Sequence, residues 1–129
     1  MSVIENLKPE LLWKQFDEIR KIPRCSKHEE KIREYILEFA KQHQLETKTD
    51  DAGNVVIIKP ASTGMQDKPT VILQGHMDMV CEKNSDVDFD FSKDAIQLNK
   101  EGDVLTAKGT TLGADDGIGV ATSLALLED

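Results

Sequence analysis

The spacing of apolar residues changes part-way along the chain, and this change restricts the fold more than any other feature. Up to about residue 43, apolar side chains recur with the helical period of about 3.6 residues. One stripe comprises Leu12, Phe16 and Ile19, and the next comprises Ile32, Tyr35, Ile36, Phe39 and Ala40. Beyond this point, short apolar runs are separated by turn residues, which is typical of strands. Helices combined with strands predict an α/β or α+β fold.

Local signals predict where the helices begin and end. Pro9 suits the first position of a helix, and Pro23 ends that helix. The second helix is expected to start at Ser26, which forms a capping box with Glu29 three residues later. Residues 118–128 are rich in Ala and Leu and are predicted to form a buried helix at the end of the chain.

Two hairpins and one further strand are predicted between these helices. Residues 45–49 and 55–58 flank the turn sequence Asp-Ala-Gly-Asn, and residues 95–99 and 104–107 flank Lys-Glu-Gly-Asp. Residues 70–74 form a short apolar run, TVILQ, of the kind found in strands buried inside a sheet.

Charge and composition exclude several classes of function. The 129 residues include 24 acidic and 16 basic side chains, which gives a formal charge of −8, and only 5% of the residues are aromatic. Nucleic acids and anionic membranes both require a basic face, so we expect neither as a partner. No run approaches the roughly 20 apolar residues that span a bilayer. The first ten residues lack the apolar core of a signal peptide.

The two cysteines, Cys25 and Cys81, lie far apart and form no C-x-x-C motif. We expect both to be reduced thiols in a cytoplasmic protein. Cys81 follows His76 by five residues, but no electropositive setting that would activate it as a nucleophile is visible.

The first candidate site residues, His76 and Asp78, follow the predicted strand at 70–74. Side chains alternate along an extended chain, so these two should point to the same side. A histidine next to a carboxylate is the arrangement of a metal ligand and the acid that orients it. Taken alone, the pair is a weak signal and is also explained by a strand-end histidine that forms a hydrogen bond with the aspartate.

The second candidate segment, residues 113–119, has the sequence Gly-Ala-Asp-Asp-Gly-Ile-Gly and leads into the last helix. Its glycines allow tight backbone conformations, and the adjacent carboxylates of Asp115 and Asp116 suit a cation. Either aspartate could instead cap the helix, and one could cap while the other binds metal. Residues 86–90 mimic the start of a calcium loop, but Phe91 and Gln97 replace its required Gly and Glu, which leaves a solvated acidic loop.

Residues 75–80, the Lys83-Asn84 pair and residues 109–119 together resemble the bacterial aminoacyl-histidine dipeptidases, also called Xaa-His or cytosol non-specific dipeptidases. These are dizinc peptidases related to carboxypeptidase G and to tripeptidases. The resemblance covers essentially the whole chain. It implies an α/β zinc-peptidase catalytic domain, in which helices flank a mixed sheet.

The resemblance also implies roles for individual residues. His76 corresponds to the histidine ligand of one zinc ion, Asp115 to the carboxylate that bridges both ions, and Asp78 to the catalytic acid that orients the histidine. The peptide between Asp115 and Asp116 is typically cis in these relatives. A hydroxide bridging the two zinc ions would attack dipeptides, especially Xaa-His, and cobalt or manganese could replace zinc.

Members of this family are several times longer than this chain. Residues 1–129 are therefore expected to be the N-terminal part of the catalytic domain, without the general base, the later ligands or the domain through which relatives form homodimers. On its own the chain is expected to be inactive. Two alternatives stay open: a non-catalytic module that associates with itself or a partner through its apolar C-terminal helix, and another peptidase of the same clan, such as an aminotripeptidase.

Overall fold

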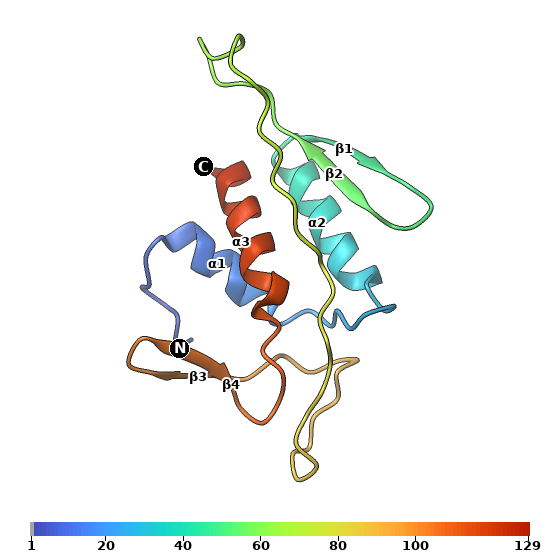
Figure 1. Ribbon diagram of the computed structural model, residues 1–129, viewed down its shortest axis with the longest axis vertical. Helices are drawn as coiled ribbons and strands as arrows, with labels where there is room; N and C mark the ends of the chain where they lie inside the picture. Colours follow the sequence, from blue (N-terminus) through green and yellow to red (C-terminus); the bar gives the residue numbers. More distant parts are fainter. Residues whose placement is uncertain (1) are drawn as a thin grey trace.

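The computed structural model describes residues 2–129 as helices and small sheets, which confirms the α/β class (Figure 1). In chain order the elements are α1 (Glu10–Ile19), α2 (Glu30–Gln42), β1 (Glu46–Thr49), β2 (Val55–Ile58), β3 (Leu98–Glu101), β4 (Val104–Ala107) and α3 (Ala114–Glu128). None of the helices formed by these residues has the length and apolarity needed to cross a membrane.

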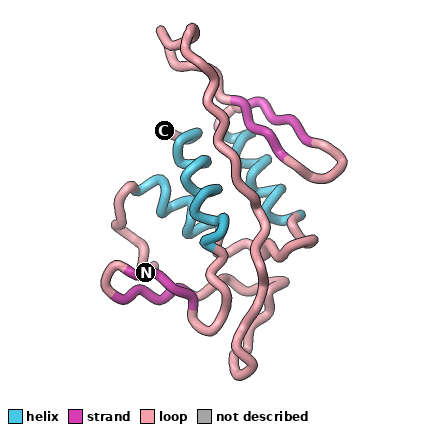
Figure 2. Tube along the Cα trace, in the orientation of Figure 1, coloured by secondary structure: helices cyan, strands magenta, loops and turns pink. Residues whose placement is uncertain are grey.

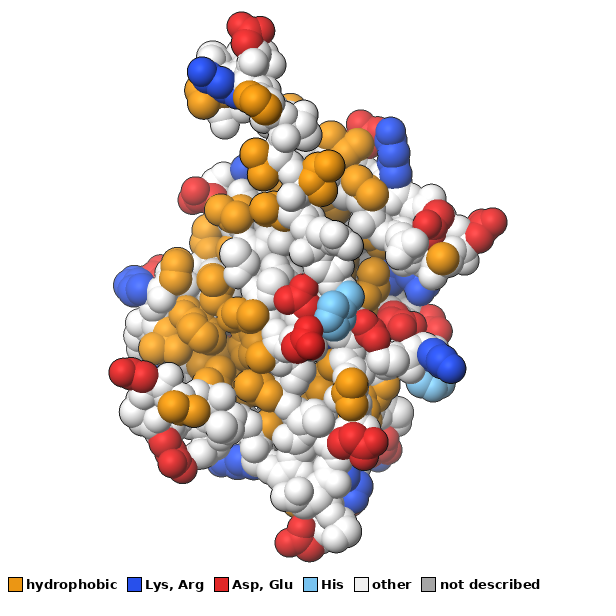
Figure 3. All heavy atoms as spheres, in the orientation of Figure 1, with side chains coloured by type: hydrophobic (Ala, Val, Ile, Leu, Met, Phe, Trp, Pro, Cys, Tyr) orange, Lys and Arg blue, Asp and Glu red, His pale blue; other side chains and the backbone are white. Residues whose placement is uncertain are grey.

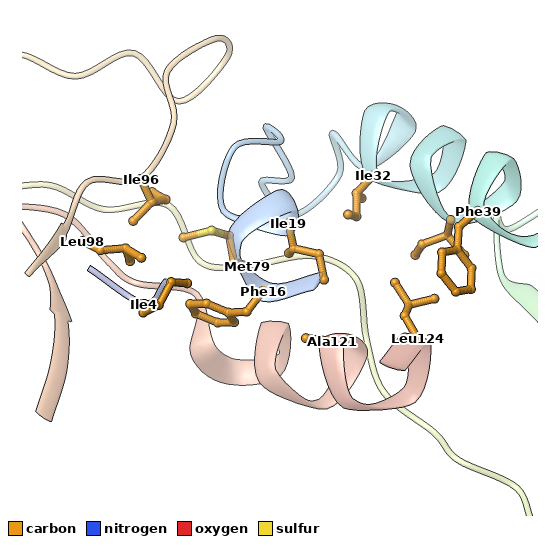
Figure 4. Close-up of a cluster of buried hydrophobic side chains, with 11 residues drawn as sticks. Ile4, Phe16, Ile19, Ile32, Phe39, Met79, Ile96, Leu98, Ala121 and Leu124 are labelled. Carbon is orange, nitrogen blue, oxygen red and sulfur yellow. The ribbon is translucent and has the colours of Figure 1, made fainter. Parts of the chain in front are cut away.

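The predicted apolar stripes of the helices form most of the core (Figure 4), although Leu12 of the first stripe is half-buried and lies outside it. Phe16 and Ile19 of α1, Ile32 of α2 and Leu124 of α3 are each at most 3% exposed. Burying an aliphatic or aromatic side chain of this size contributes about 1.5–3 kcal/mol. The predicted C-terminal helix is confirmed, and its buried side includes Ala121.

Hydrogen bonds among polar side chains also join the three helices. Gln15 of α1 is only 3% exposed. Its amide accepts a hydrogen bond from the hydroxyl of Tyr35 in α2 at 2.7 Å and donates to Glu128 in α3 at 2.9 Å. Burial raises the pKa of Tyr35 to about 12, so this hydroxyl stays a donor throughout the physiological pH range.

Both predicted hairpins form, but the first strand of the second one runs from Leu98 to Glu101 instead of residues 95–99, so Lys100 and Glu101 of the predicted turn lie in the strand. Strands β1 and β2 are antiparallel, with Glu46 opposite Ile58, and strands β3 and β4 pair with Leu98 opposite Ala107. Gly102 connects the second pair with a φ of 57°, a left-handed conformation that favours glycine. The hairpins lie at opposite ends of the helical core (Figure 1).

The prediction of a buried strand at residues 70–74 is wrong. This segment is extended but pairs with no strand within residues 2–129, and Figure 2 shows it as loop. Val71 and Ile72 are 79% and 86% exposed. An apolar run becomes a buried strand only when neighbouring strands pair with its backbone and other elements cover its faces, and the described part of the chain supplies no pairing strand. The strands of this part therefore form two separate hairpins and no mixed sheet.

The expectation of two free thiols is also wrong, because Cys25 and Cys81 form a disulfide. It joins the loop after α1 to the segment that follows His76. Backbone hydrogen bonds reinforce this link: Met79 N donates to the carbonyl of Arg24 at 2.9 Å, and Ser26 N donates to that of Met79 at 3.2 Å. The wide spacing of the cysteines gave no sign that the fold brings them together.

Candidate metal centre

Backbone pairing brings the two candidate segments together from distant parts of the chain. After the His76 segment, Asn84 N donates to the carbonyl of Gly109, and Thr111 N donates to that of Glu82, both at 2.8 Å. This pairing returns the chain to the start of α3 directly beside His76. A histidine flanked by acidic side chains lies in the middle of the face shown in Figure 3.

His76 contacts a carboxylate on each side of its ring. Its Nδ1 lies 2.9 Å from Asp78 Oδ1, and its Nε2 lies 2.8 Å from Asp115 Oδ1. His76 and Asp78 thus point to the same side, as their alternation predicted. The side chains of His76 and Asp115 are 52% and 96% exposed, so a ligand can reach both.

These contacts shift the protonation of the site. The Asp115 carboxylate, assisted by that of Asp78, raises the pKa of His76 above its ordinary value. When the imidazole is neutral and donates Nδ1–H to Asp78, the lone pair of Nε2 is free for a metal.

Ser26 is a site residue that the sequence analysis assigned to another role. Helix α2 begins after Glu29 without a side-chain cap, so the predicted capping box is wrong. The Ser26 hydroxyl instead donates to Asp78 Oδ2 at 2.5 Å. This bond, followed by the contact with His76, lowers the pKa of Asp78. Both oxygens of Asp78 are therefore held, which fixes its orientation.

Asp116 holds the backbone at His76. Its Oδ2 accepts a hydrogen bond from His76 N at 3.3 Å. Gly75 and Gly119 leave room for this carboxylate, because an added Cβ would lie 2.5 Å from Oδ2 at Gly75 and 2.2 Å from Oδ1 at Gly119. The carboxylates of Asp115 and Asp116 thus face the His76 segment, and α3 follows Gly113 without a side-chain cap. The Asp115–Asp116 peptide is cis, as the resemblance implied.

The donor set fits part of a zinc site. Imidazole nitrogen and carboxylate oxygen are both common zinc ligands, and here they are adjacent and exposed. Within residues 2–129 no group of three or more His, Cys, Asp or Glu side chains could hold a metal ion. A catalytic zinc takes about three protein ligands plus water, so a zinc ion bound here would need donors in addition to His76 and Asp115.

Arg24 is a further residue at the site that was not predicted from the sequence; it is 3% exposed and lies beneath the site. Nothing in its spacing from other residues marks it.

Comparison with known proteins extends these findings. No protein-family model matches the chain. The chain is 47% identical over its 129 residues to the cytosol non-specific dipeptidase of Escherichia coli (strain K12), of which it spans 27%. The crystal structure of aminoacylhistidine dipeptidase from Vibrio alginolyticus matches with a TM-score of 0.95 at 50% identity, covering 99% of this chain and 26% of that one. A tripeptidase from Staphylococcus aureus shares the fold, with a TM-score of 0.72 at 23% identity over 92% of this chain and 31% of that one.

The chain thus spans about a quarter of the length of the two dipeptidases that it matches. Both are hydrolases of the kind that the motifs at residues 75–80 and 109–119 predicted. In sequence and in fold, the chain is similar throughout to a portion of the aminoacyl-histidine (cytosol non-specific) dipeptidases, which confirms the resemblance.

Proposed function

We propose that this chain supplies His76, Asp78 and Asp115 to the active site of a zinc-dependent dipeptidase that prefers Xaa-His substrates. The observation that carries the proposal is the exposed pair of His76 Nε2 and Asp115 Oδ1, 2.8 Å apart, with the opposite ring nitrogen held by Asp78. The similarity to two dipeptidases supports the reaction and the class of substrate.

In this proposal each side chain has a distinct task. His76, through Nε2, and Asp115, through its carboxylate, would hold the metal. Asp78 accepts a hydrogen bond from Nδ1–H of His76 and so keeps Nε2 available, while the hydroxyl of Ser26 keeps Asp78 in place. Bound zinc would lower the pKa of water and polarise the scissile carbonyl, which allows hydrolysis at neutral pH.

We also propose a cytoplasmic location, because the Escherichia coli relative is named a cytosol dipeptidase. Homodimer formation by the full-length protein is part of the same proposal.

A module that associates through its C-terminal helix has less support. The apolar side of α3, including Ala121 and Leu124, already packs in the core with α1. Leu126, which is 53% exposed, is the main apolar side chain that this helix leaves for a partner. Size-exclusion chromatography of the wild type and of a Leu126→Lys variant tests this alternative. The alternative holds only if the variant loses the self-association of the wild type.

The proposed function is tested with the protein expressed at its full natural length. Zinc content and hydrolysis of Ala-His and β-Ala-His are measured for the wild type and for His76→Ala and Asp115→Ala. Both variants are expected to lose bound zinc and nearly all activity. His28→Ala is the matched control, since that histidine is exposed and lies outside the site. Full activity of His76→Ala would reject the metal assignment.

A further inference from the structure

Arg24 is a buried cation that connects the two halves of the candidate site. Its Nη1 donates to the carbonyls of Met77 at 3.3 Å and Asp78 at 3.2 Å, and its Nη2 donates to the carbonyl of Gly113 at 2.5 Å. The first two carbonyls belong to the segment of His76, and the third lies two residues before Asp115. One rigid guanidinium therefore spans both metal-site segments.

The surroundings of Arg24 are shaped around this group. An added Cβ at Gly113 would lie 2.5 Å from Nη2, and one at Gly117 would lie 2.7 Å from the same atom. Gly113 also has a φ of 75°, which favours glycine. The start of α3 can therefore approach the guanidinium only because Gly113 and Gly117 carry no side chain.

The partners of Arg24 are unusual for a buried charge. Among residues 2–129 it forms no salt bridge, and its Nε has no hydrogen-bond partner. The carboxylates of Asp78 and Asp116 nevertheless act on it electrostatically. Arginine suits such a position, because its planar fork of donors can hold several carbonyls in fixed directions. A buried cation that binds backbone carbonyls instead of a carboxylate sets the positions of the segments that carry them.

We infer that Arg24 is a positioning residue that sets the separation between His76 and Asp115, and with it the geometry of the metal site. It acts through the backbones of residues 77–78 and 113, whose carbonyls accept its hydrogen bonds. Where it concerns metal, this inference rests on the proposed function. Its geometric part, the pairing of His76 with Asp115, does not.

The test uses the full-length protein with the variants Arg24→Met, Arg24→Lys and Gly117→Ala. Gly117→Ala is included because it keeps Arg24 in the sequence and alanine is more favourable than glycine in a helix, while the added Cβ, 2.7 Å from Nη2, forces the guanidinium to shift. Arg20→Met is the control, because Arg20 binds Asp17 and the carbonyl of Ile96, not the site. Zinc affinity is measured by competition with a chromophoric chelator. The ¹⁵N shifts of the His76 ring are recorded in the metal-free protein.

Arg24→Met and Gly117→Ala are expected to weaken zinc binding about 10- to 100-fold, the range typical of residues that orient metal ligands, and to shift the His76 Nε2 signal. Arg24→Lys should recover part of both, and Arg20→Met should change neither. Wild-type zinc affinity and an unchanged His76 signal in folded Gly117→Ala would overturn the inference. If the wild-type protein binds no zinc and cleaves no dipeptide, the proposed function fails, and the His76 signal alone decides the role of Arg24.

Discussion

Substituting Gly75 with alanine should separate the stability of the fold from the function of the site. The new Cβ would lie 2.5 Å from Asp116 Oδ2, whereas ordinary contacts of this kind begin at 3.4 Å. The carboxylate must therefore retreat by about 0.9 Å, the difference between these two distances. Its hydrogen bond from His76 N, now 3.3 Å, would then exceed bonding distance.

The expected change in the free energy of unfolding is small, because two effects oppose each other. Hydrogen bonds to charged groups contribute about 1.5–3 kcal/mol, and this exposed one contributes less, about 1 kcal/mol. Replacing glycine with alanine reduces the conformational entropy of the unfolded chain, which raises the free energy of unfolding by about 0.4–1 kcal/mol. The net effect should lie within about 1 kcal/mol of zero, too little to unfold a typical domain.

Zinc affinity, in contrast, should fall by about 10- to 100-fold, because the backbone that carries His76 loses its anchor. Urea denaturation and a zinc competition assay on the same preparation measure the two quantities. Gly102→Ala is the control, since a Cβ there meets nothing within 4 Å and only its backbone is strained. Wild-type zinc affinity in Gly75→Ala, with or without a loss of stability, would refute the role given to Asp116.

Three further predictions concern protonation, activity and the disulfide. Asp115→Asn should lower the pKa of His76 in an NMR titration of the metal-free protein, and an unchanged pKa in the variant would contradict the pairing of His76 with Asp115. In the wild type, the raised pKa stabilises the fold below pH 6.5, and this contribution is lost as the pH rises through the pKa of His76 in the folded state. Residues 1–129 alone should bind zinc weakly and hydrolyse neither Ala-His nor β-Ala-His, and chelator-sensitive hydrolysis would disprove this expectation. Reducing the Cys25–Cys81 disulfide, which closes a loop of 56 residues, should lower the free energy of unfolding by about 4 kcal/mol, and equal urea midpoints with and without reductant would argue against the bond.

Features that depend on neighbours in sequence could be predicted. Both hairpins follow from apolar runs on either side of turn residues such as Gly53 and Gly102. The helical stripes follow from their period, and the same-side geometry of His76 and Asp78 follows from alternation along an extended chain. In each case the determining residues lie within a few positions of one another.

The errors concern features that depend on distant partners. Ser26 has the sequence context of a helix cap, but Asp78, 52 residues away, takes its hydroxyl. Cys25 meets Cys81 only because the backbone of residues 24–26 pairs with that of Met79. Arg24 likewise acquires its role from carbonyls brought to it by the fold, and a lone arginine gives no local signal of that kind.

The exposed segment at residues 70–74 has a consequence for the behaviour of the chain in concentrated solution. Val71 and Ile72 face solvent, and the backbone beside them has no partner strand within residues 2–129. An extended apolar segment with free N–H and C=O groups is a template on which a strand from another molecule can add. Lys68 and Pro69 precede it directly, and a charge followed by a residue without an N–H opposes such addition. The same segment therefore combines a tendency to aggregate with a local safeguard against it.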